Sequence, residues 1–216
     1  MGIPNEEKRE YLCSGLEVRA DGTENEPGKM TIGGFAVRYN QPTLIRDCWG
    51  DEWLEEIAAG AFDESLQGSE RRENEKKALW NHDQGKPLGS TVAGTLRFLD
   101  NKEGLEYETD LPANTWGNDA FESVKRRDVT GSSFGFICRE NHWEKVEYMG
   151  KMMDKRTIMK ADLIEVSPCT FPAYNSSEID CRSRKEYIEA QKKGSNTEHR
   201  KKLEVEKLRT EILLKL

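Results

Sequence analysis

The chain has 216 residues, of which 35% are hydrophobic and 34% are charged, so it is more polar than an ordinary single domain. That length fits one domain with a tail, or two small domains, and its longest apolar runs are too short for a transmembrane helix. The net charge is −7, and an acidic protein of this kind does not resemble a nucleic-acid binder.

The first half of the chain is dominated by short strand-like segments. Strands are predicted at 11–20 and 30–39, on either side of a polar turn. A short helix is predicted at 60–66, followed by a charged mobile loop at 67–77 and a strand at 79–82. The strands predicted at 91–99 and 105–111 form a hairpin around the turn 100–104. Most of these segments are too short and too evenly spaced for alternating parallel β-α units.

The second half contains one clear helix. Asn114 or Thr115 can cap a helix that runs to about Arg126. Its apolar residues Ala120, Phe121 and Val124 share one face at i, i+1 and i+4 spacing. Three more strands are predicted at 131–140, 143–149 and 157–166, and Pro168 and Pro172 are expected to end the run. The pattern predicts a body of short strands with two inserted helices, which favours a barrel or a sandwich, followed by a helical C-terminal tail.

The composition changes after Tyr174. The segment 176–216 carries 11 Lys and Arg against 8 Asp and Glu, so it is basic, whereas the preceding 175 residues carry 22 against 32. Val205, Leu208 and Ile212 form an apolar stripe at helical spacing, extended by Leu216. The domain hypothesis is an N-terminal segment 1–29, a main domain 30–176 and a charged helical tail 177–216, which is either removed or used for docking.

The cysteines argue against a metal site. They are scattered at positions 13, 48, 138, 169 and 181, with no CxxC pair, and the zinc motif HExxH is also absent. We therefore expect a reduced, cytosolic protein with no metal and no cofactor. Cys138 and Cys169 lie in strand-like segments, where a buried, inert cysteine is more common than a nucleophile.

Three residues suggest nucleophilic catalysis. A serine hydroxyl needs a base to accept its proton, and a third group to orient that base. The chain has only three histidines, and His82 lies at the end of a short apolar run; Ser133 lies among small and aromatic residues, and Glu165 in an apolar strand. Spacing alone leaves each of them open to a structural role. Asp83 is a poor candidate to orient His82, because neighbouring strand residues point to opposite faces.

A succession of short motifs strengthens that hypothesis. In chain order they are Phe35–Asn40, Glu56–Phe62, Leu79–Asp83, Pro87–Gly89, Gly94–Leu96, Gly104-Leu105, Ser132–Phe136, Leu163–Ser167 and Phe171–Tyr174. Over about residues 30–176 this order resembles the prohead (capsid maturation) protease family of tailed phages. The resemblance implies kinship in fold to the herpesvirus assembly protease, so we expect an α+β fold that is mostly an antiparallel β-barrel with a few surrounding helices.

The resemblance also implies a function. It indicates a serine endopeptidase that acts in the host cytoplasm, inside the immature capsid, on the scaffolding segment of the major capsid protein and on itself. No membrane or nucleic-acid partner is expected, and a homo-oligomer is left open. The alternative is a non-enzymatic assembly or scaffolding protein whose barrel only binds capsid protein.

The resemblance assigns the roles within the site. It implies His82 as the general base, Ser133 as the nucleophile and Glu165 as the group that orients the histidine. Ser132 stands where the family often has a bulkier apolar residue, which leaves open which serine attacks. The herpesvirus relatives use a second histidine as the third member, and His142 is the candidate for that alternative.

Overall fold

β-strands make up most of the described chain. The computed structural model describes residues 7–11, 16–21, 29–46 and 50–170, which all belong to one compact unit, Met1–Ser177. Its strands are β1 Glu7–Tyr11, β2 Glu17–Asp21, β3 Lys29–Arg38, β4 Thr43–Arg46, β5 Glu52–Ile57, β6 Lys77–Trp80, β7 Asp83–Ser90, β8 Leu96–Asp100, β9 Gly104–Asp110, β10 Gly131–Tyr148 and β11 Lys151–Cys169. Its helices are α1 Asp63–Leu66, the 3₁₀ turn η1 Arg72–Asn74, and α2 Thr115–Lys125.

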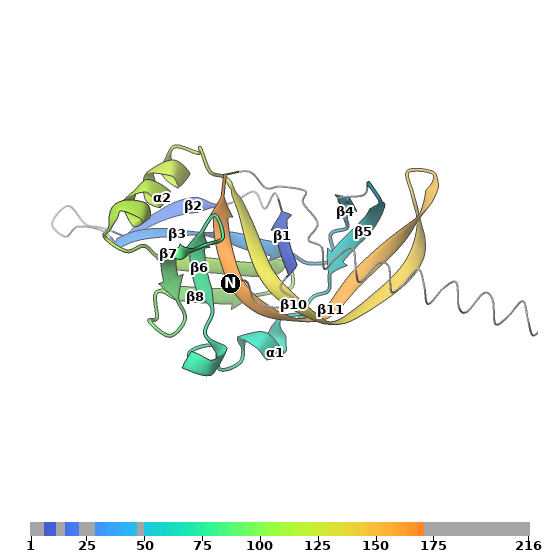
Figure 1. Ribbon diagram of the computed structural model, residues 1–216, viewed down its shortest axis with the longest axis horizontal. Coiled ribbons are helices and arrows are strands. Elements are labelled where there is room, and N and C mark those ends of the chain that lie inside the picture. Colours follow the sequence, from blue (N-terminus) through green and yellow to red (C-terminus); the bar gives the residue numbers. More distant parts are fainter. Residues whose placement is uncertain (1–6, 12–15, 22–28, 47–49, 171–216) are drawn as a thin grey trace, which may run out of the picture. The chain divides into compact units, whose positions relative to one another are not determined.

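These strands pair into two sheets (Figure 1). One has the order β1-β10-β11-β5-β4, with β6 joined to β11 and β7 joined to β6; the other has the order β2-β3-β9-β8. Nearly all the neighbours are antiparallel, but β5 and β6 run parallel to β11. The prediction of a mostly-β fold is confirmed. Among the described strands no backbone hydrogen bonding joins the two sheets, so the predicted closed barrel is not found there.

One hydrophobic core fills the space between the two sheets. It includes Ile32 and Tyr107 from the four-stranded sheet and Phe134 and Leu163 from the seven-stranded sheet, each at most 1% exposed. Phe62, which precedes α1, packs edge-on against Phe134 with ring centroids 5.8 Å apart. The core therefore holds the first third of β10 rigidly, because its inward side chains have neighbours on both layers.

The helix α2 begins and ends close to the predicted boundaries. Asn114 caps it by accepting a hydrogen bond from the Gly117 amide at 2.9 Å, and Ala120 and Val124 are buried. The indole of Trp116 donates to the Pro87 carbonyl at 3.0 Å, which ties the helix to β7.

Several other predicted boundaries were wrong. β4 and β5 lie in a stretch with no predicted strand, and β7 includes Gly85, Pro87 and Gly89, residues that usually interrupt strands. The two strands predicted at 131–140 and 143–149 are the single strand β10, continued through irregular pairing at 138–141. Pro168 does not end β11 but pairs with Ser132, while Pro172 and the predicted tail lie outside the described residues.

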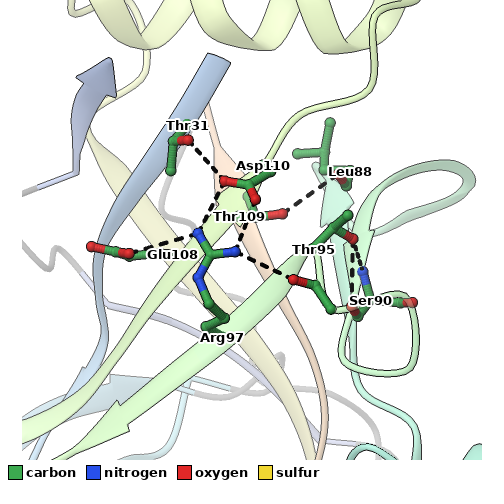
Figure 2. Close-up of polar contacts among 9 residues, drawn as sticks. Thr31, Leu88, Ser90, Thr95, Arg97, Glu108, Thr109 and Asp110 are labelled. Atoms are coloured by element: carbon green, nitrogen blue, oxygen red, sulfur yellow. Dashed lines mark hydrogen bonds and ion pairs between the residues drawn. The ribbon is translucent and has the colours of Figure 1, made fainter. Parts of the chain in front are cut away.

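The exposed side of the four-stranded sheet carries a polar network centred on Arg97 (Figure 2). Its guanidinium donates to both carboxylate oxygens of Asp110, at 2.9 and 3.0 Å, and lies 3.7 Å from Glu108. Thr31 also donates to Asp110, at 2.8 Å, so the network spans β3, β9 and β8. These carboxylates raise the pKa of Arg97, and the network fixes the register of three neighbouring strands.

Candidate functional site

A tight turn between β6 and β7 carries His82. The ladder pairs Trp80 with Asp83, which leaves Asn81 and His82 as a two-residue loop with φ values of 51° and 59°. Two positive φ values are the signature of the hairpin turn that matches the strand twist, and asparagine tolerates this conformation well. His82 was predicted to end a strand, but it lies in the turn instead. Its backbone is in the left-handed region, which is uncommon for residues other than glycine.

The end of β11 holds this turn in place. The Asn81 amide donates to the Pro168 carbonyl at 3.1 Å, and the Asn81 side-chain oxygen accepts from the Thr170 amide at 3.0 Å. The His82 amide donates to the Ser167 hydroxyl at 3.2 Å. A strained backbone conformation is stable only where several contacts hold it in place. The three hydrogen bonds described above hold the backbone of Asn81 and His82 in this way.

The His82 ring meets a buried carboxylate. Its Nδ1 lies 2.5 Å from Oε1 of Glu165, and the side chains of the two residues are 12% and 4% exposed. Ser167 donates its hydroxyl to the other carboxylate oxygen, Oε2, also at 2.5 Å. Glu165 is thus held from two sides, and its contact with Nδ1 fixes the orientation of the imidazole, with Nε2 directed away from the carboxylate.

Ser133 lies on the neighbouring strand, on the same face as these groups. β10 and β11 pair without a shift from Gly131 to Gly135, so Ser133 is opposite Ser167, and Gly135 is opposite Glu165. Side chains directly opposite each other in an antiparallel pair share a face, with Cβ atoms about 5 Å apart. The Ser133 side chain is therefore next to the Ser167 hydroxyl that touches both Glu165 and His82, and it is fully buried.

Ser132 points to the opposite face. Its hydroxyl is 3.0 Å from the Tyr107 hydroxyl of β9, across the core between the sheets. Because successive strand residues alternate in direction, Ser132 and Ser133 have separate surroundings. The hydrogen bond with Tyr107 satisfies the Ser132 hydroxyl, which explains how a polar side chain is tolerated at this core position.

The other sequence candidates lie elsewhere. His142 is an exposed residue of β10, nine positions beyond Ser133, which is roughly 30 Å along a strand. Asp83 is exposed and accepts from the Gly85 amide at 2.8 Å, a bond that, together with Lys86, lowers the pKa of its carboxyl. Glu165, and not Asp83, contacts the Nδ1 of His82. The sequence argument against Asp83 assumed that both residues lie on one strand, which was wrong, because His82 lies in the turn. Cys138 is half-buried on β10, and Cys169 is buried at the end of β11.

Two residues of this site were missed from sequence. Ser167 was quoted only as part of a motif, although its spacing of two from Glu165 on a strand places both on one face. Asn81 had a detectable signal as well, since asparagine before a polar residue between two strands favours a tight turn. No group of three or more His, Cys, Asp and Glu residues suited to a metal ion occurs in the part of the chain described here.

Comparisons with known proteins identify the family. The model of the caudovirus prohead serine protease family matches residues 14–193 of the chain. The chain belongs to this family. It is therefore a serine peptidase of phage capsid assembly, and the alternative of a purely non-enzymatic scaffolding protein is set aside.

Two further comparisons are weaker. The solved structure of the capsid assembly protease of bacteriophage T4 is similar over 76% of this chain and 99% of that chain, with 7% identity and a TM-score of 0.40. A search of curated proteins gave no significant match. Among the helices of the described ranges, none is both long and apolar enough to cross a bilayer.

Proposed function

We propose that the peptidase reaction uses Ser133 as the nucleophile, His82 as the general base and Glu165 as the residue that orients the base. The contact of 2.5 Å between His82 Nδ1 and Glu165 Oε1 is the observation that supports this assignment most strongly. A carboxylate on Nδ1 selects the tautomer whose Nε2 can accept the serine proton. The shared face of Ser133, Glu165 and Ser167 supports the choice of serine.

The chemistry follows from these positions. His82 Nε2 takes the proton of the Ser133 hydroxyl as its oxygen attacks the scissile carbonyl, and later delivers that proton to the leaving amine. Glu165 stabilises the imidazolium that forms between these two steps. The bond of Ser167 to the second carboxylate oxygen prevents Glu165 from rotating away from the ring.

The surroundings of the two alternatives argue against them. A nucleophilic Ser132 would have to leave its bond with Tyr107 and cross the sheet to reach His82. An orienting His142 would have to act from a distant, exposed position on the same strand as the nucleophile. Glu165 needs no such rearrangement.

The substrates belong to the same proposal. We infer cleavage of the scaffolding segment of the major capsid protein and of the chain itself, inside the immature capsid in the host cytoplasm. The family membership supports a role in capsid maturation, and the partners are inferred from that role.

The test is co-expression with the capsid protein, followed by mass spectrometry of both chains. Wild-type enzyme should produce defined cleavage products, and Ser133→Ala should abolish them, on the order of a 10⁴-fold loss. His82→Ala should be equally damaging, and Glu165→Gln milder. Ser132→Ala is the matched control, since it removes a neighbouring buried hydroxyl. Loss of processing in Ser132→Ala with normal processing in Ser133→Ala would overturn the assignment.

A further inference from the structure

Both backbone edges of the strand that carries Ser133 are occupied. β11 pairs with one edge, and β1 pairs with the other as an antiparallel strand in which Glu10 is opposite Ser133 and Glu7 is opposite Phe136. β1 is the terminal strand of its sheet (Figure 1). The edge of β10 on which a further strand could pair beside Ser133 is therefore filled by the N-terminal segment of the same chain.

An endopeptidase needs such an edge. Extended peptides are commonly recognised by adding a strand to a sheet, where main-chain hydrogen bonds supply affinity without a strict sequence requirement. A paired strand lies about 4.8 Å from its neighbour, so a peptide in the position of β1 would place its backbone directly beside Ser133. β1 holds that position here.

The burial of Ser133 requires a movement before substrate can bind. The Ser133 side chain is 0% exposed, yet its hydroxyl must contact the scissile carbonyl for the reaction to occur. Substrate entry therefore requires part of the chain around Ser133 to move. β11 cannot move without breaking the contacts of Glu165, whereas β1 is an edge strand whose main contacts are with β10.

We propose that the edge of β10 at Ser132–Phe136 binds an extended segment of the substrate as an antiparallel strand, and that β1 occupies this edge until the substrate displaces it. The inference rests on the proposed role of Ser133. The exchange replaces one ladder with another, so it preserves the backbone hydrogen bonds of β10. Apparent affinity for substrate is then reduced by the fraction of molecules in which β1 is paired.

Proline substitutions in the full-length chain test this exchange. Neighbouring residues of a strand direct their N–H groups to opposite sides, so one of Arg9→Pro and Glu10→Pro removes a bond to β10, and the other removes an outward N–H. The substrate is a quenched fluorescent peptide spanning a cleavage site mapped by the co-expression experiment. If β1 is paired about 90% of the time, the weakened variant should gain about tenfold in kcat/KM, mainly through a lower KM. Arg9→Ala and Glu10→Ala, which keep both N–H groups, are the matched controls and should change little.

A deletion provides the second test. A chain lacking residues 1–13 should show the same gain, and a synthetic peptide of residues 5–13 should inhibit it competitively. Unchanged or reduced kcat/KM in both proline variants, with wild-type melting temperatures, would overturn the inference, and so would failure of the peptide to inhibit an active deletion variant. Ser133→Ala in the most active variant separates the two proposals: abolished cleavage leaves the role of Ser133 intact whatever β1 does, and persistent cleavage refutes that role itself.

Discussion

Removal of the Ser167 hydroxyl should lower catalysis through Glu165. Ser167→Ala deletes the 2.5 Å hydrogen bond to Glu165 Oε2 and the acceptor of the His82 amide, both at a fully buried position. A hydrogen bond to a charged group contributes about 1.5–3 kcal/mol. If that energy is lost from the orientation of Glu165, kcat/KM falls by roughly 10- to 150-fold, since about 1.36 kcal/mol corresponds to a factor of ten.

The assay is peptide cleavage by wild type and Ser167→Ala, with kcat and KM measured separately across pH. Because Glu165 is proposed to orient the imidazole and not to bind peptide, the loss should fall on kcat, and Ser167→Thr, which keeps the hydroxyl, should recover much of it. The matched control is Ser65→Ala. Ser65 is also buried and accepts from the Leu163 amide of β11 at 2.8 Å, so it should lower stability without lowering kcat. Equal kcat in wild type and Ser167→Ala, at temperatures where both are folded, would refute the positioning role.

Three further predictions concern stability and organisation. Burial and the nearby Asp63 raise the pKa of the Asp100 carboxyl, although the hydroxyl of Tyr39 donates a hydrogen bond to it at 2.9 Å. A carboxyl whose pKa is raised in the folded state stabilises the protein below its unfolded pKa. This stability is lost as the pH rises through the folded pKa. The melting temperature of Asp100→Asn should therefore rise relative to wild type between acidic and neutral pH, and a constant difference would contradict this. Glu55 and Arg156 form a buried ion pair at 3.1 Å, so Glu55→Ala should cost about 3–5 kcal/mol in urea unfolding, because it removes a carboxylate that compensates a buried positive charge. A cost under about 1 kcal/mol would show that the pair is dispensable. Truncation after Ser177 should leave a soluble, cooperatively melting, active fragment that no longer enters proheads, whereas an aggregated fragment would show that the tail is part of the domain.

Local signals in the sequence were sufficient for some elements. The helix α2 was predicted because Asn114 is a strong cap and the buried positions repeat at helical spacing. The hairpin of β8 and β9 was predicted because Asp100–Gly104 is rich in turn residues, although β8 begins only at Leu96 and not at 91. Both features depend on residues close together in the chain.

Elements stabilised by distant partners were harder to predict. β5 pairs in parallel with β11 about 100 residues away, and its consecutive residues Trp53 and Leu54 are both buried, so it lacks the alternation of apolar and polar residues that marks a strand. β7 contains Pro87 and two glycines, and it is a strand because it pairs with β6. Long-range pairing of this kind overrides local propensity.

The candidate site shows the same division. His82, Ser133 and Glu165 could be named because they lie in motifs that resemble a known family. Their geometry depends on a parallel pairing between β6 and β11 and on an unshifted stretch of β10 and β11, neither of which short segments encode. For the same reason the contacts of Ser167, whose hydroxyl bonds to both the Glu165 carboxylate and the His82 amide, are seen only in the structure.

The most direct test of the proposed site is covalent labelling of the active enzyme. A small serine-directed phosphonate, applied to an active variant and followed by peptide mapping with mass spectrometry, should form one adduct on Ser133 at a rate matching the loss of activity. His82→Ala should slow labelling strongly, because the hydroxyl then lacks its base. An adduct on Ser132, or labelling of Ser133 at an equal rate in His82→Ala, would contradict the assignment of Ser133 and His82.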